Sequence, residues 1–259
     1  MAARIHVFDA LDNFRDYGGY GTAAGALLRA DRLYRSAHHA GLSDADLERL
    51  AVIDFGTVVD LRRPVERRRQ PSRRPEGFSG VVIESDLDEA GEAPHITFLK
   101  TADLTPDSGR RFMTETYRQL PFAPAHLDLF ARYFRALADS DRPVLIHCAA
   151  GKDRTGILAA LTHHLLGVTD DDLMADYLLT NTAVDLKARA PGIAEQLKAL
   201  TGRTASHDAV VAFMGVEADY LHAAIAAMTE RHGSVDGYLD QALGVDAALR
   251  DRIGERLAA

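Results

Sequence analysis

The stretch that decides the fold is DRPVLIHCAAGKDRTGILAALTHHLLG, residues 141–167. The apolar run at 143–146 predicts a short buried strand that ends at His147. Cys148 follows in a tight loop, and Arg154 then opens an apolar helix. A strand that leads through a short loop into a helix N-terminus forms an anion site, because the loop amides turn inward and the helix dipole adds positive potential.

The residue types in this loop suit phosphoryl transfer to sulfur. Cys148 faces the amide donors, so its thiolate is stabilised and can attack an electrophile that the same donors hold. Arg154, six residues further on, suits a bidentate contact with a tetrahedral oxyanion. Gly151 lets the backbone turn where a Cβ would intrude, and Thr155 can donate its hydroxyl to the thiolate. The residues assigned to substrate binding are His147, Ala149, Ala150, Gly151, Lys152 and Thr155.

The loop HCAAGKDRTG resembles the phosphate loop of the Cys-dependent protein tyrosine phosphatases. With Lys152-Asp153 before the arginine, the loop resembles the phosphate loops of a bacterial branch of this family. That branch includes a mycobacterial protein tyrosine phosphatase and a Listeria lipid phosphatase. The resemblance extends over nearly the whole chain. The further matching segments are NFRD at 13–16 with Gly18-Gly19, LYRS at 33–36, VVDLR at 58–62, MTETYRQLP at 113–121, ADYLLTN at 175–181 and HGSVDGYL at 232–239.

This resemblance implies a single α/β domain over residues 1–259 with a tyrosine-phosphatase-like fold. That fold has a mostly parallel central sheet flanked by helices, and a helical C-terminal layer or a lid at about 182–215. The implied activity is hydrolysis of phosphotyrosine, and some members also accept phosphoserine, phosphothreonine and phosphoinositides. Lys152 adds a point charge that suits a second phosphate on an inositol ring. The resemblance further implies that His147 orders the loop and that Asp60-Leu61-Arg62 buttresses it.

Two aspartates compete for the role of general acid. A tyrosine or alcohol leaving group needs a proton donor within hydrogen-bond reach. Asp153 lies inside the loop, at a position that members of this branch are thought to use. Asp86, with Asp88 as its near neighbour, matches an aspartate where other tyrosine phosphatases keep a mobile acid loop. We favour Asp153 over Asp86, although no sequence argument decides between them.

Strand-like and helical segments alternate along the first half of the chain, which favours an α/β sheet. The second half is mostly helical. The expected strands are 33–36, 57–61, 81–85 and 143–147. The expected helices start near Ser43 and cover about 124–139, 154–166, 171–180, 182–200, 217–232 and 246–258. Residues 62–80 and 86–109 are expected to be long loops, because Gly and Pro punctuate them.

Composition narrows the function classes. The chain has 259 residues, with 30 Lys and Arg against 38 Asp and Glu, so its net charge is −8 and a general nucleic-acid binder is disfavoured. Cys148 is the single cysteine, which excludes a disulfide within the chain and CxxC or zinc-finger sites. No cofactor or metal is expected. The N-terminus has no apolar signal run and no stretch resembles a membrane helix, so a cytoplasmic location is expected, with export by another route left open.

Several alternatives stay open from the residues alone. The plain alternative is a buried cysteine behind a strand, with an arginine on a helix surface. A rhodanese-like sulfur transferase also uses a cysteine in an anion loop, although that loop is usually shorter. A phosphate-binding module without turnover is a third possibility, and a phosphoinositide phosphatase is a fourth. The basic run from Arg62 to Arg74 is either a solvated loop or a patch that steers anionic substrates. For a phosphatase, the expected substrate is a phosphorylated protein or phosphoinositide; the oligomeric state is not predicted.

Overall fold

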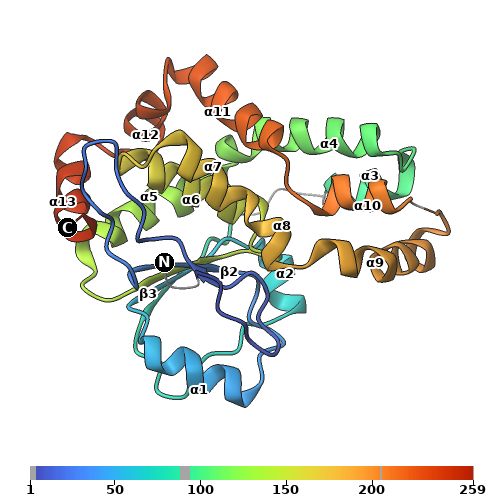
Figure 1. Cartoon of the computed structure of the whole chain (residues 1–259), viewed down its shortest axis with the longest axis horizontal. Helices are drawn as coiled ribbons and strands as arrows, with labels where there is room; N and C mark the ends of the chain where they lie inside the picture. Colours follow the sequence, from blue (N-terminus) through green and yellow to red (C-terminus); the bar gives the residue numbers. More distant parts are fainter. Residues whose placement is uncertain (1–3, 88–93, 205, 259) are drawn as a thin grey trace.

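The computed structural model describes residues 4–87, 94–204 and 206–258 (Figure 1). A five-stranded sheet has the order β1-β2-β5-β3-β4, in which only β1 runs antiparallel to its neighbour. The strands are β1 (Arg15–Asp16), β2 (Leu33–Ser36), β3 (Thr57–Asp60), β4 (Val81–Ile83) and β5 (Val144–His147). This confirms the predicted α/β class with a mostly parallel sheet.

Helices cover both faces of the sheet and form the second half of the chain (Figure 1). They are α1 (Asp44–Ile53), α2 (Pro64–Arg69), α3 (Pro94–Thr101), α4 (Pro106–Gln119), α5 (Pro124–Asp139), α6 (Asp153–Leu165), α7 (Asp170–Leu178), α8 (Thr180–Ala183), α9 (Leu186–Thr201), α10 (His207–Met214), α11 (Ala218–His232), α12 (Val235–Leu243) and α13 (Ala247–Leu257), with a short 3-10 helix η1 (Leu120–Phe122).

Side-chain alternation along the central strands separates two cores. Val58 and Leu145 point to the face covered by α1, where they join one apolar cluster. Val59 and Ile146 point to the opposite face, where they pack in the larger cluster with residues of α5 and α6. Because successive residues of a strand face opposite sides, a continuous apolar run fills both cores at once. Figure 1 shows α1 on one side of the sheet and α5 and α6 on the other.

The register places three strand ends at one edge of the sheet. His147, the last residue of β5, is level with Ser36 of β2 and with Asp60 of β3. The carboxyl ends of neighbouring parallel strands therefore meet at the point where the chain enters the loop after β5. Open parallel sheets commonly bind ligands at such an edge.

The two predicted long loops contain helices. Residues 62–80 include α2, whose first turn closes through the backbone N–H of Arg63, which donates to the Glu66 carboxylate at 2.7 Å. Residues 86–109 include α3 and the start of α4, where the Thr105 side chain caps the helix. Both α2 and α4 carry proline at the first helical position, where its missing N–H costs nothing. The prolines therefore mark helix starts, and the loop prediction was wrong there.

The helix expected over 182–200 is divided in two. Asp185 adopts a left-handed backbone with φ of 43° and separates α8 from α9. Further on, α10 packs against α4 and α9, and together with α3 these helices form an arm at one side of the molecule (Figure 1). Within the described residues, one stretch, His207–His232, is long and apolar enough by composition to cross a membrane, contrary to expectation. Its two helices both pack on α4, which accounts for their apolar character.

Candidate active site

The loop from Cys148 to Lys152 joins β5 directly to the N-terminus of α6. Cys148 is only 2% exposed. Gly151 has φ of 65°, and a Cβ at this position would lie 2.3 Å from the carbonyl oxygen of Ser36. Both the backbone conformation and the close approach of β2 therefore require glycine here.

Three successive carbonyl groups of the loop are held on its outer side. The carbonyl of residue 149 accepts from the backbone N–H of His38 at 3.1 Å. The Asn13 side-chain amide donates to the carbonyls of residues 150 and 151, at 3.2 and 2.8 Å. Arg35 adds a second donor to the carbonyl of residue 151 at 3.1 Å. Because these carbonyls are held by other groups, the loop N–H groups can converge on an anion; the anion site itself stays a prediction.

A buried ion triad stands behind these donors. Asp176 of α7 accepts from Arg15 at 3.1 Å and from Arg35 at 2.7 Å, and all three side chains are almost fully buried. Burial raises the pKa of Asp176, but the two guanidinium groups outweigh it and the net shift is well downward. The carboxylate therefore stays charged and fixes Arg35, which contacts the loop, and Arg15, which contacts Asn13.

Arg154 is oriented by a residue that the sequence analysis did not select. Its Nη1 and Nη2 donate to the two carboxylate oxygens of Glu66 at 2.6 and 3.0 Å, and Nη1 also contacts the Leu61 carbonyl at 3.1 Å. Burial lowers the pKa of Arg154, but Cys148 and Glu66 outweigh it and the net shift is upward. Burial raises the pKa of Glu66, but Arg154 acts in the opposite direction, and the net pKa is lowered to about 2. Both groups are thus charged near neutral pH.

The predicted buttress at 60–62 acts in part through its backbone. The N–H of Leu61 donates to the carbonyl of His147 at 2.8 Å, and the carbonyl of Leu61 holds Arg154. The side chains of Asp60 and Arg62 pair with each other at 2.7 Å. This segment therefore supports the loop from the β3 side.

Asp153 lies at the start of α6, beside the loop. The hydroxyl of Tyr117 donates to its Oδ1 at 2.9 Å, and Tyr177 in turn donates to Tyr117 at 2.8 Å. The Lys152 ammonium lies 3.4 Å from the same oxygen. Within the described residues, the hydrogen bond from Tyr117 and the ion pair with Lys152 both involve Oδ1, so Oδ2 is left for a reacting group.

Asp86 follows β4 and is 93% exposed at its side chain. Its carboxylate pairs with Arg67 of α2 at 2.7 Å. Arg67 belongs to α2, the helix that also carries Glu66, so Asp86 is tied to that helix. Its near neighbour Asp88 lies outside the described residues.

Lys152 is turned toward α10. Its Nζ donates to the Phe213 carbonyl at 2.9 Å, and the residue is only 6% exposed. The Phe213 ring stacks on Phe98 at 5.5 Å between centroids and also contacts Phe112. The Lys152 ammonium, predicted to suit a second phosphate, thus links the loop to the aromatic cluster of α3, α4 and α10.

His147 and Thr155 are fully buried on either side of Cys148 in the sequence. Burial lowers the pKa of His147 to about 4, so the ring is neutral at neutral pH. Its Nε2 is 3.7 Å from Asp60, and among the described residues neither ring nitrogen has a hydrogen-bond partner. The Thr155 hydroxyl likewise has no partner among those residues. The expected bonds from His147 to the loop and from Thr155 to the thiolate stay predictions.

The supporting residues that received no role from the sequence include Asn13, Arg35, Glu66 and Asp176. Asn13, Arg35 and Asp176 lie within segments quoted for the family resemblance, so a signal for their position existed but none for their contacts. Glu66 is surrounded by arginines and had no such signal. No group of three or more His, Cys, Asp or Glu in the described part of the chain could hold a metal ion.

The arrangement is suited to holding a tetrahedral anion against a buried thiol. Comparison with known proteins agrees with it. The pattern of the tyrosine phosphatase family matches residues 6–259. A Cupriavidus necator protein named as a tyrosine-protein phosphatase is 35% identical over 241 residues, which cover 93% of this chain and 85% of the relative. The Mycobacterium tuberculosis protein named triple specificity protein phosphatase PtpB is 34% identical over 270 residues, covering 93% of this chain and 94% of the relative.

Proposed function

The chain belongs to the tyrosine phosphatase family, and on that premise we propose that it hydrolyses phosphotyrosine through a phosphocysteine on Cys148. Membership makes it a phosphoric monoester hydrolase. The observation that carries the proposed mechanism is the outward anchoring of the carbonyls at 149–151 by His38, Asn13 and Arg35. That anchoring leaves the loop amides to hold the phosphoryl oxygens, directly beside the thiol.

The first step forms a bond between Sγ of Cys148 and phosphorus. The bond between phosphorus and the tyrosine oxygen breaks, and the leaving oxygen takes a proton from the general acid. The loop amides and the Arg154 guanidinium stabilise the charge on the equatorial oxygens. In the second step water attacks phosphorus, the P–S bond breaks, and phosphate and the thiolate are released.

We assign the general acid to Asp153, with Asp86 as the alternative. Asp153 begins α6 next to the nucleophile loop, and Tyr117 fixes one of its oxygens at 2.9 Å. Asp86 is exposed and tied to Arg67. In the second step the same carboxylate accepts a proton from the attacking water.

The substrate range is proposed to include phosphoserine and phosphothreonine. The name of the mycobacterial relative, a triple specificity protein phosphatase, supports this extension. Phosphoinositides are the alternative substrate class, with Lys152 as the contact for a second phosphate. That role requires Nζ to leave the Phe213 carbonyl, which it contacts at 2.9 Å. We therefore favour the protein substrate.

Helices α9 and α10 are proposed to act as a lid over the loop. The contact between Lys152 and the Phe213 carbonyl and the burial of Cys148 support this role. Opening would then precede substrate entry.

A cytoplasmic location remains part of the proposal, and fractionation of cells that express the protein tests it.

Phosphate release from a phosphotyrosine peptide and from a panel of phosphoinositides tests the proposal. Wild type and Cys148→Ser are compared side by side, with vanadate binding as a check on the folded loop. Turnover of the peptide by wild type alone supports the mechanism, and the ratio between substrates gives the class. Equal turnover by both proteins, or vanadate binding without any turnover, contradicts it.

A further inference from the structure

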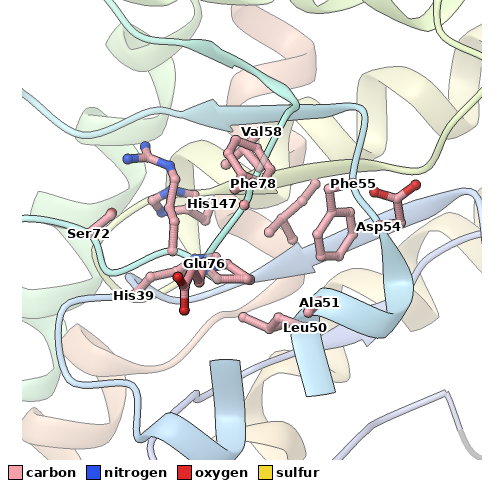
Figure 2. A pocket seen from close by; sticks show the side chains of 14 residues that line it. His39, Leu50, Ala51, Asp54, Phe55, Val58, Ser72, Glu76, Phe78 and His147 are labelled. Carbon is pink, nitrogen blue, oxygen red and sulfur yellow. The ribbon is translucent and has the colours of Figure 1, made fainter. Parts of the chain in front are cut away.

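A cavity lies on the α1 side of the sheet, away from the Cys148 loop. It opens between α1, the strands β3 and β5, and the segment 72–78 (Figure 2). Its volume is about 70 Å³. One water molecule needs ~10–15 Å³ by this measure, so the cavity has room for a group of about five to seven heavy atoms.

Apolar side chains form most of the cavity wall. Leu50, Phe55, Val58, Leu145 and Phe78 contribute to it, and four of these belong to the buried cluster beneath α1. Figure 2 shows Leu50 and Phe55 on one side and His39 and His147 on the other. An apolar ligand body gains free energy by displacing water from such a wall.

The two histidines of the wall are neutral. Their rings stack with centroids 4.6 Å apart and an interplanar angle of 17°. Burial lowers the pKa of His39 well below its ordinary value and that of His147 to about 4. They therefore add flat aromatic surface and no positive charge to the cavity at neutral pH.

Arg74 supplies the charge. It lines the cavity and is half-buried, and within the described residues its guanidinium has no hydrogen bond or ion pair. Its neighbours along the chain differ in this respect, since Arg62 pairs with Asp60 and Arg73 pairs with Asp44 at 2.6 Å. A half-buried guanidinium without a partner favours an anionic ligand.

Two carboxylates also lie at the cavity. Asp54 is neutralised by Arg142, which donates to it at 2.5 Å. Glu76 is exposed, so water screens its charge. The charge that remains unmatched at the half-buried wall is therefore that of Arg74.

We propose that this cavity binds a small carboxylate with a branched apolar body, which inserts among Leu50, Phe55 and Val58 and pairs its carboxylate with Arg74. The site is separate from the catalytic loop, because His147 faces the α1 side whereas Cys148 packs in the cluster on the opposite face. It nevertheless adjoins that loop, since His147 lies directly before Cys148. The assignment does not depend on the proposed reaction.

Methyl NMR of the whole chain tests the site, with isovalerate as the probe and isovaleramide as its uncharged counterpart. Vanadate is present at saturation so that the catalytic loop is occupied. The expected result is a saturable shift of the Leu50, Val58 and Leu145 methyl signals by isovalerate. Isovaleramide is expected to bind at least tenfold more weakly.

Two variants probe the charge and the space. Arg74→Gln should weaken isovalerate at least tenfold, while Arg68→Gln, which removes an exposed charge of α2, should leave it unchanged. Ala51→Phe should block the mouth from an exposed helix position and abolish the shifts. Equal binding of acid and amide, equal effects of the two arginine variants, or binding that vanadate removes would overturn the proposal.

Discussion

Arg154 and Glu66 face each other as a bidentate ion pair, with N–O distances of 2.6 and 3.0 Å, although 88 positions separate them in the sequence. Both side chains are mostly buried, at 16% and 24% exposure. Glu66 sits in the short helix α2, so that helix sets the direction of the guanidinium. A fixed guanidinium loses less freedom when it binds a phosphoryl group.

Glu66→Ala is expected to lower kcat/KM by about 10- to 100-fold, the effect of losing a hydrogen bond to a charged group. Glu66→Gln keeps one acceptor oxygen for Arg154 and should lose less. Steady-state kinetics with a phosphotyrosine peptide measures both. Because the pKa of Glu66 is about 2, the difference between wild type and Glu66→Gln should persist down to about pH 4. Unchanged kinetics in Glu66→Ala would contradict the positioning role.

Asp176→Asn is expected to cost about 3–5 kcal/mol of unfolding free energy, because it leaves two buried guanidinium groups without a counter-charge. Urea unfolding measures it. Asp12→Asn is the matched control, since Asp12 pairs with Arg189 at the surface and should cost less than about 1 kcal/mol.

The same triad gives a pH signature. The pKa of Asp176 is lower in the folded chain than in the unfolded chain, where it is about 3.9. Its contribution to stability is therefore complete above that value and is lost as the pH falls below it. Asp176→Asn should show a shallower loss of stability with acid than wild type. Parallel pH curves for the two proteins would speak against the ion triad.

Asp153→Asn should reduce kcat by about 10²–10⁴-fold if it removes the general acid. A general acid must be protonated, so activity falls as the pH rises, and this fall should flatten in the variant. Asp86→Asn should keep the wild-type profile. The loss of kcat in Asp153→Asn should shrink for an aryl phosphate whose leaving group needs no proton. The opposite result, a flattened profile in Asp86→Asn only, would move the role to Asp86.

Phe213→Ala removes the ring that stacks on Phe98 and Phe112 and should loosen α10 over the loop. Inactivation of Cys148 by peroxide is expected to become several-fold faster, because the proposed lid would then shield the thiolate less. Val52→Ala, at an exposed position of α1, serves as control. If wild type reacts as fast as an open thiolate, the shielding role of the lid is wrong.

Local patterns predicted much of the fold. The strand predicted at 33–36 and the helix predicted at 124–139 have their observed bounds, and the strand predicted at 143–147 starts one residue later, at Val144. Helix α1 starts next to Ser43 as expected, and the Ser43 side chain caps it, accepting from the backbone N–H of Asp46 at 3.1 Å. Errors arose in 62–80 and 86–109, where prolines at helix starts looked like loop residues.

The nucleophile loop was predictable because its strand, turn and helix start are contiguous, so their geometry depends on neighbouring residues alone. The residues that hold this loop in place could not be predicted in the same way. Asn13 reaches it across 138 positions, and Arg15 meets Asp176 across 161. Such contacts depend on how the sheet and helices pack, and many side chains of the same type could make them. The sequence by itself therefore determined the strand, loop and helix start that present Cys148 and Arg154 and predicted the chemistry proposed for them, whereas only the tertiary structure decided that Asn13, Arg35, Glu66 and Asp176 hold them in position.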